Sequence, residues 1–178
     1  MMNGVIVADN DFLMRGILRS MLVGVGQTVF LASCGEEAVA FGTRLQARLV
    51  LLDLAMPRTN GLVACTQLRR LPGYAATPIV ILTALEDAEA RRAAVHVGAT
   101  LFFTKPFRPA SLLQALVPYL GLDPLTQETV ARAAHRAQEI AAYDPDPAST
   151  RLQPSGAAPP RPSQAMEHGR SILDVYRP

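Results

Sequence analysis

Residues 49–61 read LVLLDLAMPRTNG, in which a run of apolar residues ends at an aspartate, Asp53. A short continuous apolar run is typical of a strand that is buried on both faces, as in a parallel sheet. The segment therefore predicts a buried strand over residues 49–52, with a carboxylate standing directly after its last apolar residue.

Four further apolar runs predict strands at residues 5–8, 28–32, 79–82 and 101–103. Between the runs, apolar residues recur at helical spacing, as in Leu13, Met14, Ile17, Leu18, Met21 and Leu22, and again in Leu62, Cys65, Leu68 and Leu71. This alternation predicts right-handed βαβ crossovers and a parallel sheet covered on both faces. A last helix is expected over about residues 110–120, shortened by Pro118.

Polar side chains follow the expected strands at the points where the strands stop. They are Asp9, Asn10 and Asp11 after the first strand, Asp53 after the third, Thr83 at the end of the fourth and Lys105 after the fifth. In open α/β sheets, ligands bind at the carboxyl ends of the strands, beside the point where the strand order reverses. The sequence therefore predicts one pocket that contains carboxylates, a hydroxyl and an ammonium group.

The expected pocket has the groups needed to phosphorylate an aspartate. A carboxylate forms an acyl phosphate when a metal ion neutralises the phosphoryl oxygens and a fixed cation holds the product. Mg²⁺ takes one or two carboxylates and completes its octahedron with other oxygens, so Asp9 and Asp53 suit it. Thr83 and Lys105 can then bind phosphoryl oxygens.

Lys105 is the single lysine among 17 basic residues, and it stands in FFTKPF at residues 102–107. A surface position that only needed a cation would favour arginine in this composition, so the lysine indicates a specific role. The bond before Pro106 is also a candidate cis peptide, since cis bonds occur essentially before proline.

Four motifs make the chain resemble the receiver domains of bacterial two-component response regulators, a CheY-like family, over about residues 3–121. The motifs are VIVADND (5–11), LLDLAMPRTNG (51–61), ILTA (81–84) and FFTKPF (102–107). The resemblance implies a flavodoxin-like fold, with a doubly wound five-stranded parallel sheet in the order 2-1-3-4-5 and helices on both faces. It also implies a phosphoryl donor that is a histidine kinase or a histidine phosphotransfer protein.

Site roles follow from the same resemblance. Asp53 is the expected phospho-acceptor, and Thr83 and Lys105 are expected to contact the phosphoryl group. Mg²⁺ is expected to be held by Asp9, Asp53 and the backbone carbonyl of Ala55.

The resemblance also implies a switch. Phe102 matches the family's switch aromatic, which turns inward when Thr83 moves toward the phosphate. The downstream protein is expected to bind the face formed by the fourth helix, the fifth strand and the fifth helix.

One position departs from the family pattern, which has two adjacent acids after the first strand where this chain has Asp9 and Asn10. An amide oxygen still ligates Mg²⁺, so Asn10 remains an expected ligand, but the missing negative charge predicts weaker metal binding. Asp11 is expected to cap the first helix, where a carboxylate is favoured by free amides.

Two other functions fit parts of the sequence. Asn10 favours a receiver fold that binds partners without taking phosphate, whereas Asp53, Thr83 and Lys105 favour phosphorylation. Residues 9–11 also resemble the D-x-D nucleophile motif of haloacid-dehalogenase-type phosphatases, but the paired acids that such enzymes place later in the chain are missing. The protein is therefore expected to be a phospho-acceptor and not an enzyme.

Composition and charge argue against a membrane protein, a secreted protein and a nucleic-acid-binding protein. No apolar run approaches the roughly 18 residues of a membrane span, and the N-terminus has no signal-peptide pattern, so a cytoplasmic protein is expected. The net charge of +2 comes from dispersed arginines, which gives no indication of nucleic-acid binding. Cys34 and Cys65 are expected to be reduced packing residues, and His96, His135 and His168 surface or packing residues.

The chain is expected to divide into a receiver domain (1–122), an extension helix (123–143) and a disordered tail (144–178). Asp123 and Pro124 are typical of a helix start, and Val130, Ala134, Ala137 and Ala141 give the helix a weak apolar stripe. The helix is therefore expected to dock only weakly on the receiver domain. The core of that domain is expected to be complete by about residue 122. The tail has seven prolines in 35 residues, too few apolar residues to fold alone, and no output domain is recognised after residue 121, so a stand-alone regulator is expected.

Overall fold

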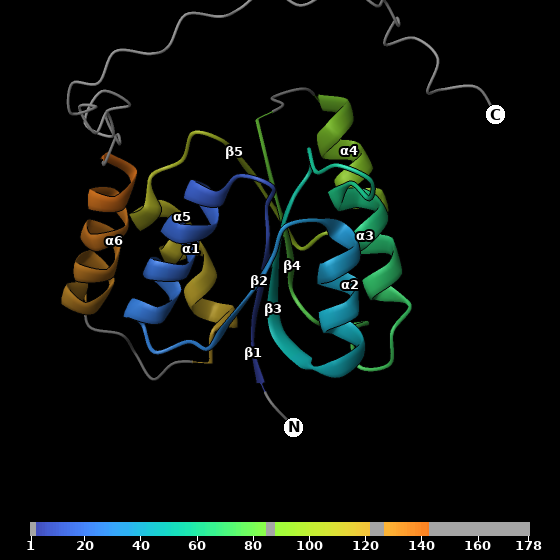
Figure 1. Cartoon of the computed structure of the whole chain (residues 1–178), viewed down its shortest axis with the longest axis horizontal. Helices are drawn as coiled ribbons and strands as arrows, with labels where there is room; N and C mark the ends of the chain where they lie inside the picture. Colours follow the sequence, from blue (N-terminus) through green and yellow to red (C-terminus); the bar gives the residue numbers. More distant parts are fainter. Residues whose placement is uncertain (1–2, 85–87, 122–126, 143–178) are drawn as a thin grey trace, which may run out of the picture. The chain divides into compact units, whose positions relative to one another are not determined.

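A five-stranded parallel sheet forms the centre of the structure, a computed structural model that describes residues 3–84, 88–121 and 127–142 (Figure 1). The strand order is β2-β1-β3-β4-β5, as expected. The strands are β1 (Asn3–Ala8), β2 (Val29–Ala32), β3 (Gln46–Asp53), β4 (Ile79–Thr83) and β5 (Leu101–Thr104). The chain moves outward from β1 to β2 and then returns to the other side of β1, so the order reverses between β1 and β3.

Helices cover both faces of this sheet, with α1 and α5 on one face and α2, α3 and α4 on the other (Figure 1). Their bounds are α1 (Phe12–Gly24), α2 (Gly35–Arg44), α3 (Gly61–Arg69), α4 (Ala88–His96), α5 (Pro109–Leu116) and α6 (Gln127–Ala142). The last receiver helix was expected to reach residue 120, but α5 ends at Leu116 and Val117–Tyr119 forms a 3₁₀ turn. Pro118 lies in this turn and has no N–H with which to continue the α-helix.

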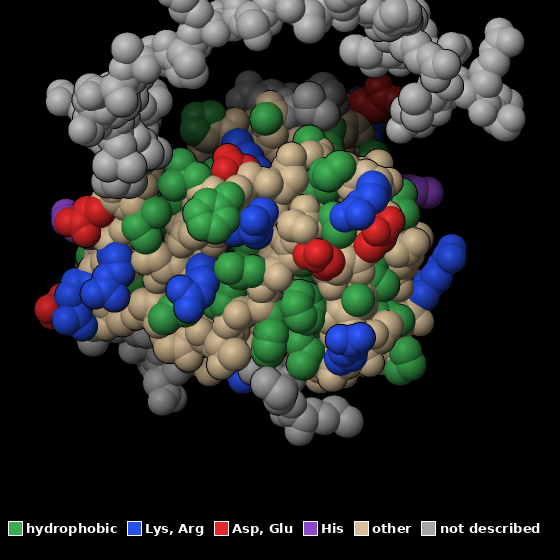
Figure 2. Space-filling view, in the orientation of Figure 1, with side chains coloured by type: hydrophobic (Ala, Val, Ile, Leu, Met, Phe, Trp, Pro, Cys, Tyr) green, Lys and Arg blue, Asp and Glu red, His purple; other side chains and the backbone are tan. Residues whose placement is uncertain are grey.

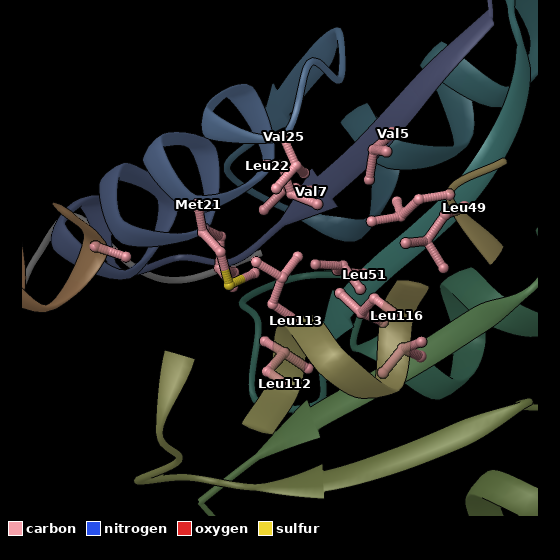
Figure 3. Packing of buried hydrophobic residues seen from close by; sticks show 14 of the residues in the cluster. Val5, Val7, Met21, Leu22, Val25, Leu49, Leu51, Leu112, Leu113 and Leu116 are labelled. Atoms are coloured by element: carbon pink, nitrogen blue, oxygen red, sulfur yellow. The ribbon is translucent and has the colours of Figure 1, made fainter. Parts of the chain in front are cut away.

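Two apolar cores lie on the two faces of the sheet because successive side chains of a strand point to opposite sides. Val5 and Val7 of β1 face α1 and α5, whereas Ile6 and Ala8 face α2 and α3. Figure 3 shows the first core, in which Met21 and Leu22 of α1 meet strand side chains and leucines of α5. Cys34 and Cys65 are both buried and form no disulfide.

The expected apolar face of α1 is confirmed except at its first position. Ile17, Leu18, Met21 and Leu22 are buried, whereas Leu13 is 39% exposed. The helix begins at Phe12, so Leu13 lies in the first turn, where its N–H donates to the capping carboxylate of Asp11.

Helix α6 packs against α1 and α5 and extends the first core. Its buried residues are Ala133, Ala134 and Ala137, with Val130 and Ile140 partly buried against the same core. The predicted stripe was wrong at Ala141, which is exposed, because the buried positions follow the 3.6-residue period through residue 140.

The contribution of α6 to the core differs from the expectation that the core is complete by residue 122. A Cβ built on Gly24 of α1 would lie 3.0 Å from the Cβ of Ala133 in α6, so small residues let the two helices come close together at this point. The division into residues 1–122, 123–143 and 144–178 stays a prediction. Asp123, Pro124 and the predicted disordered tail lie outside the described residues. The described residues all belong to one compact unit, Met1–Asp144.

Surface features agree with the dispersed charge of the sequence. Basic and acidic side chains are intermixed with apolar ones on the face shown in Figure 2. Within the described ranges, no helix has the length and apolar character needed to cross a membrane.

Candidate functional site

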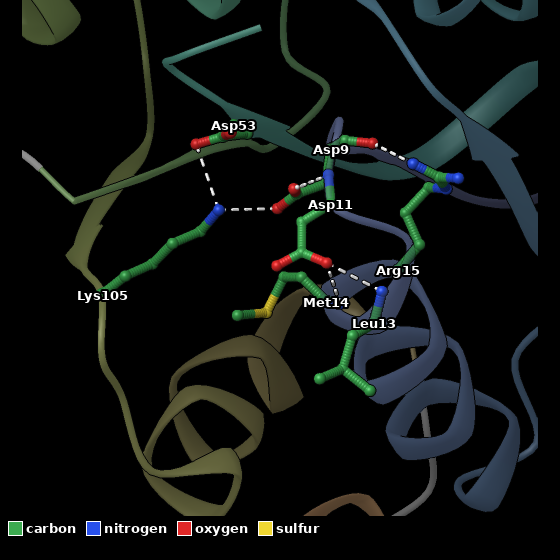
Figure 4. Close-up of polar contacts among 7 residues, drawn as sticks. All are labelled: Asp9, Asp11, Leu13, Met14, Arg15, Asp53 and Lys105. Atoms are coloured by element: carbon green, nitrogen blue, oxygen red, sulfur yellow. Dashed lines mark hydrogen bonds and ion pairs between the residues drawn. The ribbon is translucent and has the colours of Figure 1, made fainter. Parts of the chain in front are cut away.

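Two buried carboxylates meet one ammonium group at the carboxyl edge of the sheet (Figure 4). Lys105 Nζ lies 2.7 Å from Asp9 Oδ2 and 3.2 Å from Asp53 Oδ1. The side chains of Asp9 and Asp53 are 0% and 5% exposed, and that of Lys105 is 16% exposed. A lysine therefore bridges two acids that are largely withdrawn from water.

The alternation of side chains along the strands explains why these three residues meet. Asp9 continues the face of β1 that carries Val5 and Val7, and Asp53 continues the face of β3 that carries Leu49 and Leu51. Lys105 follows Leu101 and Phe103 on the same face of β5. All three strands end at the same edge, so their polar residues converge beside α1 and α5.

The loops around the site are fixed by backbone contacts. The N–H of Lys105 donates to the carbonyl of Thr83 at 2.6 Å, and the Lys105–Pro106 bond is cis, as the sequence allows. After Asp53 the chain turns into α3, and Gly61 passes so close to the Asp53 carbonyl that any Cβ there would collide with it. Asn60 caps α3 by accepting a hydrogen bond from the Val63 N–H at 3.0 Å.

Asp9 is held by polar contacts on each side. Its Oδ1 accepts from the Asp11 N–H at 2.9 Å, and its backbone carbonyl accepts from Arg15 Nη1 at 2.6 Å. Burial raises the pKa of Asp9 above its ordinary value of 3.8, and the Asp53 charge raises it further, while the hydrogen bonds from Lys105 and Asp11 oppose these effects. One ammonium group thus faces two carboxylates, and an excess negative charge remains when both are ionised.

The other residues after β1 lie at the rim. Asp11 caps α1 as expected, with its Oδ1 accepting from the N–H groups of Leu13 at 2.8 Å and Met14 at 3.4 Å. Asn10 is exposed and stands outside the Asp9–Asp53–Lys105 contacts. Ala55, in the loop after β3, is also exposed.

Thr83 and Phe102 belong to the opposite face of the sheet. Thr83 is fully buried at the end of β4, after Ile79 and Ile81. In the β4–β5 register Ile81 pairs with Phe102, so Phe102 and Thr83 project to one side of the sheet on neighbouring strands. Phe102 is half-buried and packs against the second core.

A family model described as the response regulator receiver domain matches residues 5–117. The chain belongs to this family. Receiver domains act in two-component signalling, where they interact with histidine kinases, and they are regulators and not enzymes in the usual sense. The resemblance inferred over about residues 3–121 is thereby confirmed.

This receiver domain is similar to several known proteins. It is 37% identical over 108 residues to the "Probable transcriptional regulator ycf27" of Porphyridium aerugineum, a match that covers 61% of this chain and 44% of the relative. The chain thus spans less than half the length of that curated relative.

Two solved structures share the fold. The chemotaxis protein CheY4 of Vibrio cholerae, 29% identical, has a TM-score of 0.63 over 67% of this chain and 99% of its own. The receiver domain of the sensor histidine kinase PA1611 from Pseudomonas aeruginosa PAO1, 24% identical, has a TM-score of 0.61 over 68% of this chain and 100% of its own. In that protein a magnesium ion is coordinated in the active site cleft.

Sequence reasoning missed three side-chain contacts of the described residues. The guanidinium of Arg15 reaches back to the Asp9 carbonyl, and that of Arg91 lies over the Phe102 ring, with Cζ 4.8 Å from the ring centroid. His135, expected to be a surface or packing residue, is exposed and lies 3.6 Å from Glu139 on α6. The i,i+4 spacing of His135 and Glu139 was visible in the sequence, whereas nothing in the spacing signals the two arginine contacts.

A Mg²⁺ ion at this site would be bound by only a few protein oxygen atoms. Within residues 3–84, 88–121 and 127–142, no three His, Cys, Asp or Glu side chains group as a metal site. Mg²⁺ is nevertheless bound in proteins through one or two carboxylates, with water and other oxygens completing the shell. The buried, incompletely neutralised pair Asp9 and Asp53 fits that requirement.

Proposed function

We propose that this receiver domain accepts a phosphoryl group on Asp53 from a phosphohistidine donor. The observation that carries the proposal is the lysine bridge, in which Lys105 Nζ contacts both Asp9 and Asp53 at the carboxyl edge of the sheet. A surface ion pair would not need two buried acids. The arrangement instead provides a carboxylate nucleophile, a second carboxylate and a fixed cation within one small volume.

In the proposed reaction, an Asp53 carboxylate oxygen attacks the phosphorus of phosphohistidine. The new P–O bond forms as the P–N bond breaks, and the electron pair of that bond stays on the departing imidazole nitrogen. Lys105 then shifts its ammonium group from the Asp53 carboxylate to a phosphoryl oxygen, since the phosphorylated carboxyl no longer carries its own charge. The Thr83 hydroxyl donates to a second phosphoryl oxygen.

The carboxylates of Asp9 and Asp53 would hold Mg²⁺, together with the backbone carbonyl of Ala55 and the amide oxygen of Asn10. When bound, the ion supplies positive charge that neutralises the phosphoryl oxygens during transfer. The excess negative charge of the two buried acids over the single ammonium group of Lys105 supports a cation site here. The magnesium ion in the cleft of the PA1611 receiver domain supports the same assignment.

Phosphorylation is proposed to act as a switch on protein contacts. Thr83 moves toward the phosphoryl group, and Phe102 turns inward on the same side of the sheet. The partners proposed are a histidine kinase or a histidine phosphotransfer protein as donor, and a downstream protein that binds the face of α4, β5 and α5. Because the ycf27 relative is named a transcriptional regulator, the expected absence of nucleic-acid contact stays a prediction, as does the cytoplasmic location.

Acetyl phosphate tests the proposal directly, because it supplies a phosphoryl group without any partner protein. The full chain incubated with acetyl phosphate and Mg²⁺ is expected to gain the mass of one phosphoryl group, and peptide mapping is expected to place it on Asp53. EDTA should prevent the gain. An unchanged intact mass in the presence of Mg²⁺ would rule out phosphorylation, and would leave the phosphorylation-independent binding module as the better function.

Asn10→Asp is expected to tighten Mg²⁺ binding by about tenfold. A full negative charge about 4 Å from a divalent cation is worth roughly 1–2 kcal/mol even in a high-dielectric surrounding. Calorimetric titration of both proteins with Mg²⁺ measures the effect.

Gln67→Glu is the matched control, since it adds the same charge to an exposed position near the C-terminal end of α3. Equal affinity of Asn10→Asp and the parent protein would show that the side chain at position 10 points away from the ion.

A further inference from the structure

The contact between Arg91 and Phe102 joins α4 to β5 at the surface. The Arg91 guanidinium carbon lies 4.8 Å from the centroid of the Phe102 ring, within the range of a cation–π interaction. Arg91 itself is exposed, and Phe102 is half-buried. The ring therefore has the second core on its inner side and a cation on its outer side.

The Phe102 ring borders a surface hollow, so its neighbours do not enclose it on every side. Arg91 and Phe102 line a surface hollow of about 270 Å³, together with Ala94, Val95, Ala99, Thr100 and Leu101. Small side chains form much of this lining, so one side of the ring borders open space rather than a close-packed neighbour. The guanidinium is consequently a specific restraint on where the ring lies.

The sheet register links this restraint to the candidate site. Phe102 pairs with Ile81, and Thr83 follows two residues later on the same face. Thr83 and the Phe102 ring therefore lie on the same side of the sheet, on neighbouring strands. This placement allows a change at Thr83 to affect the position of the Phe102 ring.

We propose that Arg91 is a positioning residue that holds Phe102 in the half-buried position it has in this structure, called the outward position below, and so favours the unphosphorylated state. This inference rests on the proposed function, since it assigns Arg91 a part in the switch between Thr83 and Phe102. The Phe102 ring must lose its contact with Arg91 when it turns inward, and phosphorylation has to supply the free energy for this change. Removing the guanidinium lowers the free energy that phosphorylation must supply.

The expected size of the effect follows from the strength of an exposed cation–π contact. Losing it shifts the balance between outward and inward states by about two- to fivefold. Where the inward state is the minor one and reacts faster, the rate of labelling rises by about the same factor.

The test compares Arg91→Ala with Arg92→Ala in the full chain. Arg92 is also exposed and is the next residue of α4, so its replacement removes the same charge from nearly the same place. Two quantities are measured: the rate of phosphorylation by acetyl phosphate with Mg²⁺, and the ring resonances of Phe102 in NMR spectra, assigned with Phe102→Leu. Arg91→Lys, which keeps a cation, serves as the conservative variant.

The expected result is faster labelling and shifted Phe102 resonances in Arg91→Ala, with Arg92→Ala unchanged and Arg91→Lys close to the parent protein. If Arg91→Ala matches Arg92→Ala in both measurements while the parent protein is labelled, Arg91 does not position the ring and the inference fails. If the parent protein itself takes no label, the proposed function fails, and the inference fails with it.

Discussion

Asp53→Asn is expected to abolish phosphorylation by acetyl phosphate while leaving the protein folded. An amide cannot form the acyl phosphate, and no other carboxylate shares the position of Asp53 at the end of β3. The variant should be at least as stable as the parent, because Lys105 keeps its closer contact with Asp9, while the repulsion between the two carboxylates is removed. Intact mass and thermal melting by circular dichroism measure the two effects.

Asp11→Asn is the matched control for this variant. Asp11 is a carboxylate two residues from Asp9, but it caps α1, and asparagine caps a helix about as well as aspartate. The control should therefore take label at a rate close to that of the parent protein. Full labelling of Asp53→Asn would place the acceptor elsewhere, and loss of label in Asp11→Asn would give the cap a role in the chemistry.

Lys105→Met is expected to destabilise the metal-free protein by about 3–5 kcal/mol near neutral pH, the usual effect of removing one partner from a buried ion pair. Methionine has a similar length but no charge, so Asp9 and Asp53 would remain buried without the ammonium group that contacts both. Phosphorylation should also fall sharply, since the phosphoryl oxygens lose their fixed cation. Denaturant unfolding in EDTA measures the stability.

The loss of stability in Lys105→Met should depend on pH in a defined direction. The pKa of Asp9 is raised in the folded state, so the folded protein binds this proton more tightly than the unfolded chain, and ionised Asp9 costs stability above its folded pKa. Lys105 opposes the rise, so its removal moves the pKa of Asp9 higher still. The destabilisation by Lys105→Met should therefore be largest at high pH and shrink as the pH falls through the folded pKa of Asp9.

Two comparisons separate this explanation from a simple packing defect. Mg²⁺ should raise the melting temperature of Lys105→Met more than that of the parent, because the ion replaces the missing positive charge. Lys105→Arg should keep most of the stability but not the phosphorylation rate, since its planar guanidinium places charge differently from a compact ammonium. If Lys105→Met and the parent are equally stable across the pH range in EDTA, the contacts of Lys105 with Asp9 and Asp53 contribute nothing to the stability of the metal-free protein.

The sequence was informative where residue type and periodicity act locally. Apolar runs such as residues 49–52 and 79–82 form strands because a parallel sheet buried on both faces selects continuous apolar segments. Asp11 was recognised as a cap because capping involves only the next few amides. The strand order and the family followed from four motifs read together, and both are confirmed.

Where the prediction failed, the deciding contacts come from residues far apart in the chain. Leu13 fits the apolar spacing of α1, but it lies in the first turn of the helix and is 39% exposed. The alanine-rich α6 buries more than its composition suggested because Gly24 of α1 allows a close approach. Composition counts apolar atoms, whereas burial depends on how closely the partner helix can come.

The α/β class, the strands, the family and the residues at the carboxyl edge could all be predicted without a structure, because they depend on residue type, period and motif. Three features could be learned from the folded protein alone: Lys105 bridges Asp9 and Asp53, Asn10 stands at the rim, and Arg91 covers Phe102. Those contacts join separate strands, loops and helices, and their distances depend on sheet register, strand length and helix placement. Local sequence does not encode such distances, because each one is set by the packing of the whole domain.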